Sequence, residues 1–80
     1  MLTTPSSPVV TALARGLELL RAFGAGEEYL GNAELSNRTN IPRPTVSRLT
    51  YTLTQLGYLQ HNTHLEKYRL GPGVLALGYR

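Results

Sequence analysis

Apolar residues between positions 8 and 24 recur every three or four residues, the spacing of an amphipathic helix. The stripe that they form contains Val10, Leu13, Leu17 and Leu20, widened by Leu19 and Phe23. We therefore expect a first helix that begins near Pro8, with Ser7 as its cap, and that ends at Gly24 and Gly26. This stripe should face the core, and the alternative for some of its residues is a dimer seam.

A second helical pattern occupies residues 43–56. Its apolar positions, spaced by three, four and three residues, are Val46, Leu49, Leu53 and Leu56. Pro42 and Pro44 mark its start, because the N–H groups of a first helical turn have no partner within the helix. Gly57 should end the helix.

A shorter helix should precede this one, from about Ala33 to Arg38, with Asn32 as its N-cap. Ala33 and Leu35 are expected to point inward. Asn40 then lies in the connecting turn, and asparagine tolerates the left-handed backbone that a tight turn requires. Ile41 should fill the angle between the two helices.

After Gly57 the pattern changes to two short strands, at residues 58–60 and 67–70, with a polar hairpin tip at 61–66. A three-helix core that contains a helix-turn-helix and is followed by a hairpin is a winged helix. The predicted fold is therefore mainly α with a small β-hairpin. Gly71-Pro72-Gly73 interrupts the chain, and Val74, Leu75 and Leu77 begin a further helix.

The side of the 43–56 helix that lies opposite its apolar stripe is polar and aromatic, and it carries no carboxylate. It contains Pro44, Ser47, Arg48, Tyr51 and Gln55, flanked by Arg43 and Thr54. No Asp or Glu occurs between Leu35 and Leu65. Since solvated helix faces usually mix both signs of charge, this face and the net charge of +3 favour a polyanionic partner.

The composition excludes several other classes. Eighty residues make one small domain, and with no cysteine there is neither a disulfide nor a cysteine-based zinc site. The chain has no apolar run of about 18 residues and no secretory signal, so we expect a cytoplasmic protein with no membrane segment. There is no glycine-rich phosphate loop and no catalytic constellation, which predicts a non-enzyme without a cofactor. His61 and His64 lack the further ligands of a metal site.

Several stretches of the chain resemble one known family. Residues 14–20, 34–36, 42–49, 56–59 and 68–72, which together span about 12–78, are similar to the N-terminal DNA-binding domain of IclR-type transcriptional regulators. The resemblance implies a homodimer on a pseudo-palindromic double-stranded DNA operator. It also implies that a small-molecule effector binds to a C-terminal domain outside these 80 residues.

On this basis residues 1–7 are expected to form a disordered arm, 8–71 the DNA-binding domain and 72–80 the start of a linker helix. The recognition helix, about 43–56, should enter the major groove. The residues expected to contact DNA are Arg43, Pro44, Thr45, Ser47, Arg48, Tyr51, Asn32 at a helix N-terminus and Lys67 on the wing. The alternative for the helix residues is a merely solvated face, and Thr45 and Asn32 have competing structural uses as backbone partner and cap.

A second function remains open from the sequence alone. Winged helices also serve as protein-interaction modules without DNA binding. The acid-free face favours DNA, and an affinity for random duplex that falls steeply with salt would distinguish the two functions.

Overall fold

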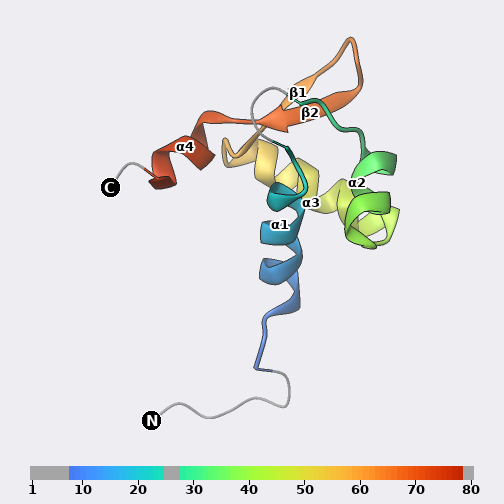
Figure 1. Ribbon diagram of the computed structural model, residues 1–80, viewed down its shortest axis with the longest axis vertical. Helices are drawn as coiled ribbons and strands as arrows, with labels where there is room; N and C mark the ends of the chain where they lie inside the picture. The colour runs from blue at the N-terminus through green and yellow to red at the C-terminus, as the bar shows by residue number, and fades with distance from the viewer. Residues whose placement is uncertain (1–7, 25–27, 79–80) are drawn as a thin grey trace.

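The computed structural model describes residues 8–24 and 28–78. In chain order the elements are α1 (Thr11–Arg21), α2 (Asn32–Thr39), α3 (Arg43–Gln55), β1 (Leu59–Asn62), β2 (Lys67–Leu70) and α4 (Pro72–Gly78). Figure 1 shows α2 and α3 together on one side, the hairpin projecting beyond them and α4 leading away on the other side. The predicted winged helix-turn-helix is confirmed. The N-terminal arm, the Ser7 cap and Gly26 fall outside the described residues.

One apolar core joins the three helices to the base of the wing. Each of the first three helices and the first strand contributes a side chain that is at most 1% exposed, namely Leu19, Leu35, Val46 and Leu59. Phe23, Leu30 and Ile41 complete the buried cluster. A domain of this size buries little surface, so its stability depends heavily on these few contacts.

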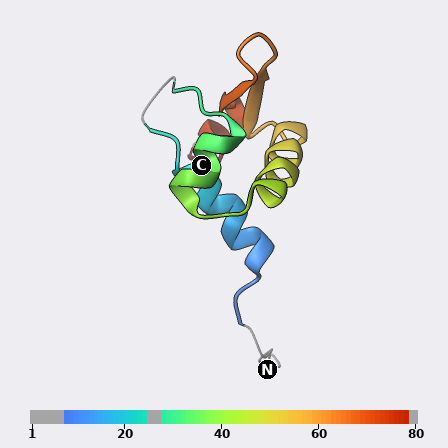
Figure 2. The same ribbon diagram turned by 90° about the vertical axis from the view of Figure 1, so that its right-hand side faces the viewer.

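The turn between α2 and α3 has the predicted left-handed residue. Asn40 has φ 62° and donates its backbone N–H to the Ser36 carbonyl at 2.8 Å. The Ser36 hydroxyl donates to the Ile41 carbonyl at 2.6 Å, and Ile41 is buried as expected. Pro42 is the N-cap of α3, and Pro44 lies in its first turn. Figure 2 shows the two helices side by side below the wing.

The wing is an antiparallel pair in which Leu59 lies opposite Leu70 and Asn62 opposite Lys67. Leu30 adds a bridge to Tyr68, with reciprocal N–H to carbonyl bonds of 2.8 Å, so the segment before α2 is hydrogen-bonded to β2. Tyr58 lies outside β1, which continues to Asn62, and the hairpin tip is correspondingly shorter than expected. The strand extends into the polar segment that was expected to form the tip, because Asn62 still pairs with Lys67 across the hairpin.

Two glycines fasten the wing to the end of α3. Gly57 has φ 87°, which L side chains rarely adopt. Gly71 packs so closely that a Cβ there would lie 2.6 Å from the Gly57 carbonyl oxygen. Pro72 then begins α4 directly, so Pro72 and Gly73, expected to interrupt the chain, belong to that helix's first turn.

The prediction for the first helix was wrong in its start and in part of its buried face. The helix begins at Thr11, because Val10 is extended, with ψ 105°; β-branched residues accept that conformation readily. Val10, Leu13 and Leu17 are 67%, 62% and 50% exposed. The residues that face inward are Gly16, Leu19 and Phe23. The helix is apolar on two sides, and only tertiary packing selects one of them. It also ends at Arg21, before Gly24.

Two further predictions about inward positions fail, and one buried position was not predicted. Ala33 and Leu56 are exposed, the latter by 63%, while Thr50 is fully buried on α3. Leu56 is the C-cap of α3 and lines an open concavity beside α1 instead of the core. Thr50 was overlooked because a threonine in a helical pattern gives no apolar signal.

Asn32 is not the N-cap of α2. That position belongs to Gly31, whose backbone N–H donates to the Glu34 carboxylate at 2.7 Å. Glu34 also pairs with Lys67 on β2 at 3.3 Å. The Gly31 hydrogen bond, followed by the Lys67 ammonium, holds the pKa of Glu34 below its ordinary value. The Asn32 side chain is therefore available for contacts with α3.

The two faces of α1 give a direct test of the packing. Leu19→Ala should lower the free energy of unfolding by about 2–5 kcal/mol, since it leaves a cavity in a fully buried site. Leu17→Ala on the half-exposed face is the matched control and should change it by less than about 1 kcal/mol. Urea unfolding of the dilute chain measures both, and equal losses would contradict the assigned face.

The Glu34 contacts predict a pH dependence. A carboxylate whose pKa is lowered by folding stabilises the fold above its unfolded-state pKa, and this contribution disappears as the pH falls through the folded-state pKa. Glu34→Gln should therefore flatten the loss of stability between about pH 5 and 3. Glu18→Gln, at an exposed position of α1, is the control. Parallel curves for wild type and Glu34→Gln would contradict the prediction.

Candidate nucleic-acid interface

The outer face of α3 is exposed from its first residue onward. Pro44, Ser47, Arg48 and Tyr51 are all exposed, Tyr51 by 66%, and Arg43 begins the helix at the same surface. The opposite face buries Val46 and Thr50, which fixes the orientation of the helix. A helix held on one side and open on the other presents its side chains in a defined geometry, and the structure thus brings these predicted site residues together.

The cations of this region differ in their partners. The Arg38 guanidinium bonds both Glu28 oxygens, at 3.2 and 3.0 Å, and donates to the Ala22 carbonyl at 3.0 Å. The Arg38 hydrogen bond is the main reason that the pKa of Glu28 is lowered. Arg38 therefore ties α2 to the end of α1. Within the described residues, Arg43 and Arg48 pair with no carboxylate. Their charges remain directed at solvent.

Asn32 lies behind the exposed face. Its Nδ2 donates to the Ser47 hydroxyl at 3.2 Å, and its Oδ1 accepts from the buried Thr50 hydroxyl at 3.3 Å. Thr50 also lies 3.1 Å from the Ser47 carbonyl, a second acceptor for the same hydroxyl. Asn32 thus links the first turn of α2 to the middle of α3. Sequence reasoning missed Thr50 altogether, and no local pattern marks it.

Two other residues predicted to contact DNA are less available for such a contact. Thr45 is half-buried, and its hydroxyl makes no hydrogen bond to the part of the chain that the structure describes. Lys67 projects from β2 toward Gly31 and is paired with Glu34. Its charge is therefore partly compensated within the protein.

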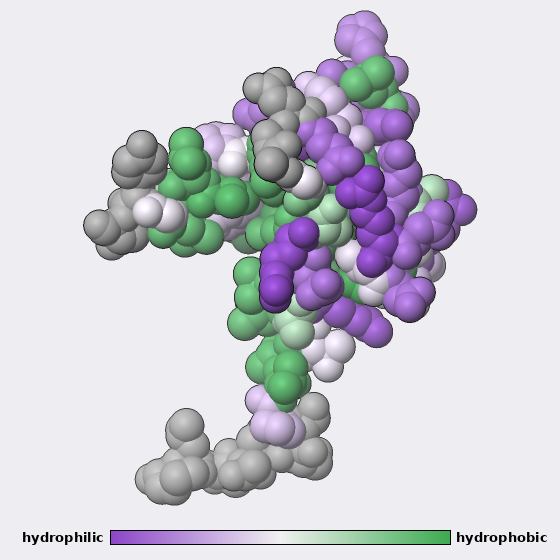
Figure 3. Space-filling model, in the orientation of Figure 1, coloured by the Kyte–Doolittle hydropathy of each residue, from purple (hydrophilic) through white to green (hydrophobic). Residues whose placement is uncertain are grey.

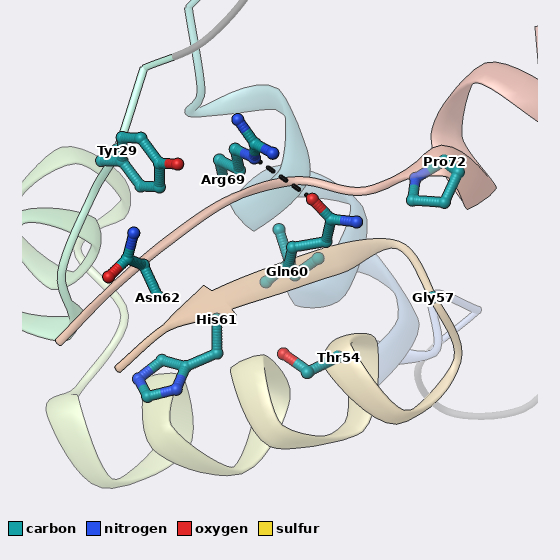
Figure 4. Close-up of a pocket in the computed structure, with 9 residues that line it drawn as sticks. Tyr29, Thr54, Gly57, Gln60, His61, Asn62, Arg69 and Pro72 are labelled. Atoms are coloured by element: carbon teal, nitrogen blue, oxygen red, sulfur yellow. Dashed lines mark hydrogen bonds between the residues drawn. The ribbon is translucent and has the colours of Figure 1, made fainter. Parts of the chain in front are cut away.

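The wing has two different faces. Arg69 donates through Nε to Gln60 across the strand pair, at 3.1 Å, and its guanidinium lies 5.5 Å from the centre of the Tyr29 ring. Figure 4 shows Tyr29 and Arg69 on one side of the hairpin and His61 and Thr54 on the other. An open depression of about 570 Å³ runs along β1, and it is lined by residues from both of these sides. These contacts stiffen the wing close to the end of α3.

A second concavity is strongly apolar. It has a volume of about 330 Å³ and is formed by α1, the end of α3 and α4. Its lining includes Leu13, Leu17, Leu49, Leu53, Leu56 and Leu77. Figure 3 shows hydrophobic side chains along both arms of the notch between α1 and α4, whereas the side of α2 and the wing is hydrophilic. We call this feature the apolar groove.

The described residues contain neither a metal cluster nor a membrane-spanning helix. Across residues 8–24 and 28–78, no three His, Asp or Glu side chains gather closely enough to share a metal ion. Within the same ranges, no helix has the length and hydrophobicity needed to span a bilayer.

Comparisons with known proteins agree with this architecture. The family model of the IclR helix-turn-helix domain matches residues 12–63. The transcriptional regulator TsaQ1/TsaQ2 of Comamonas testosteroni is 50% identical over 70 residues, which cover 88% of this chain and 25% of that protein. The Pca regulon regulatory protein of Pseudomonas putida is 43% identical, over 88% of this chain and 23% of its own length. The chain thus spans about a quarter of these relatives.

A solved structure shares both fold and sequence. The IclR family transcriptional regulator of Brucella abortus superposes with a TM-score of 0.83 at 55% identity, over 89% of this chain and 27% of that one. The family match covers the helix-turn-helix and the start of the wing, the elements that build the exposed face of α3. The chain belongs to the IclR family of helix-turn-helix transcriptional regulators.

Proposed function

We propose that this chain binds double-stranded DNA in a sequence-specific manner, as the DNA-binding part of a bacterial-type transcriptional regulator. The observation that carries the proposal is the exposed face of α3, on which Arg43 and Arg48 have no carboxylate partner within the described residues. The major groove, about 12 Å wide, admits one helix. The protein acts by binding rather than catalysis, in the cytoplasm, where its DNA is found.

The roles on DNA follow from position along α3. The N-terminal half of the helix reaches the base edges, because its C-terminal end leads back toward the wing. We assign Arg43, Ser47 and Arg48 to the bases, and Pro44, Thr45 and Tyr51 to the groove wall and backbone. Lys67 makes a weaker phosphate contact, since it shares its charge with Glu34. Asn32 supports Ser47 from behind.

We further propose that two copies act together on a pseudo-palindromic operator. The apolar groove supports a second copy as its occupant, because Leu13, Leu17 and Leu56 are each at least half exposed there. The groove lining includes none of Arg43, Ser47, Arg48 and Tyr51, so pairing leaves the DNA-facing side of α3 open. Half-sites one helical turn apart would be separated by roughly 34–36 Å.

The organisation of the whole protein belongs to the same proposal. Residues 8–71 form the DNA-binding domain, and α4 begins a linker. We place the binding of a small-molecule effector outside these 80 residues, in keeping with the fourfold greater length of the relatives. Calorimetric detection of a metabolite bound to this chain would contradict that placement.

Arg48 tests the DNA-binding face. Arg48→Ala should weaken binding to a selected operator by about 1–3 kcal/mol and relax base preference, because the guanidinium is lost from the centre of the face. Arg21→Ala removes the same charge from an exposed position of α1 and is the control. Fluorescence anisotropy over a salt series measures both. Binding that is insensitive to salt would instead favour a protein-interaction module.

Leu13 tests the pairing of two copies. Leu13→Glu should abolish cooperative binding to a two-half-site operator, since it places a charge in the apolar groove. Ala14→Glu, on the same helix but outside the groove lining, should not. Inserting about five base pairs between half-sites should likewise abolish cooperativity, because it rotates one site to the far side of the duplex. Unchanged binding to the expanded site would refute the geometry.

A further inference from the structure

The Ser47 hydroxyl accepts a hydrogen bond from another helix, unlike the threonine hydroxyls that bond back to their own helix. Thr39, Thr52 and Thr54 each donate to the carbonyl four residues earlier, at 2.7, 2.9 and 2.7 Å. That bond uses the single hydrogen of the hydroxyl. The Ser47 oxygen accepts a bond from Asn32 instead, and within the described residues it donates to no group. Its hydrogen is therefore left for a partner outside the protein.

Thr50 gives this arrangement its direction. Its side chain is fully buried, so its hydroxyl must donate to an acceptor, and two lie within reach, the Ser47 carbonyl at 3.1 Å and the Asn32 Oδ1 at 3.3 Å. An amide that turns its oxygen toward Thr50 turns its NH₂ group toward Ser47. The contacts Thr50, Asn32 and Ser47 thus run from the core to the surface, and the Asn32 amide directs its hydrogens at the Ser47 oxygen.

The geometry points to Ser47 as a directed hydrogen-bond donor in base recognition and to Asn32 as the positioning residue that directs it. This inference rests on the proposed DNA binding by α3. In the major groove, guanine N7 and O6, thymine O4 and adenine N7 accept hydrogen bonds, whereas cytosine presents the N4 amino donor. The position that Ser47 reads should accordingly exclude cytosine.

Selection of bound duplexes from a random pool by the full chain tests the assignment. Wild type should show one position at which cytosine is depleted. Ser47→Ala should reduce the discrimination against cytosine at that position by about three- to tenfold, which corresponds to the loss of one hydrogen bond. The base preference at other positions should persist, which identifies the position that Ser47 reads.

Asn32→Asp is the decisive variant. A carboxylate only accepts, so it takes the Ser47 hydrogen and leaves the Ser47 lone pairs facing the groove. Cytosine should then be enriched at the same position by about three- to tenfold relative to wild type. Asn37→Asp adds the same charge at an exposed position of α2 and should weaken binding without altering any base preference. A purely structural role for Asn32 would not produce this change of base.

The outcomes separate the two levels of the proposal. The directed donor is overturned if Ser47→Ala changes the base preference at no position of the DNA site. It is also overturned if Asn32→Asp weakens binding without changing a base preference, as Asn37→Asp should. If Asn32→Asp fails to fold, Asn32→Ala replaces it in the test. Asn32→Ala should weaken the base preference at the position that Ser47 reads without enriching cytosine there. An unchanged base preference at that position overturns the inference. A wild-type chain that selects no sequence and binds duplex independently of salt would overturn the proposed function itself.

Discussion

The left-handed turn at Asn40 is the constraint on which the DNA-facing surface depends. It ends α2 with φ 62° and lets Ile41 enter the core between α2 and α3. The Ser36 hydroxyl fixes the exit of the turn through the Ile41 carbonyl. Once this angle is set, the rotation of α3 about its axis is set by the burial of Val46. The turn therefore sets the direction of every exposed side chain of α3.

Polar contacts then decide which groups remain available at that surface. Arg38 and Lys67 are matched by Glu28 and Glu34, both at the edges of the helix-turn-helix. No carboxylate of the described residues is paired with a cation on α3 itself. A polyanion approaching α3 therefore meets positive charge that the fold has not already compensated. Asn32 is likewise committed within the protein, because its side-chain amide bonds the hydroxyls of α3 and does not cap its own helix.

The apolar groove is a separate consequence of small size. With seven buried apolar residues among those that the structure describes, the core cannot cover both sides of α1, and Leu13 and Leu17 stay exposed beside α4. Because this surface lies away from α2 and the wing, covering it would stabilise the fold without obstructing α3. In our proposal, recognition of DNA and pairing of copies therefore use different faces of one small core.

The sequence by itself determined the elements and their order. Helical spacing, the prolines at 42 and 44 and the turn residue Asn40 are local signals, and local backbone preferences act wherever the chain goes. The acid-free face of α3 could likewise be read from the helical period. Only the tertiary structure decided which side of α1 is buried, because Leu17 and Leu19 are equally apolar and differ only in what packs against them. It also decided that Thr50 is buried and that Asn32 bonds α3, since these contacts join residues 18 positions apart and no local pattern encodes such a distance.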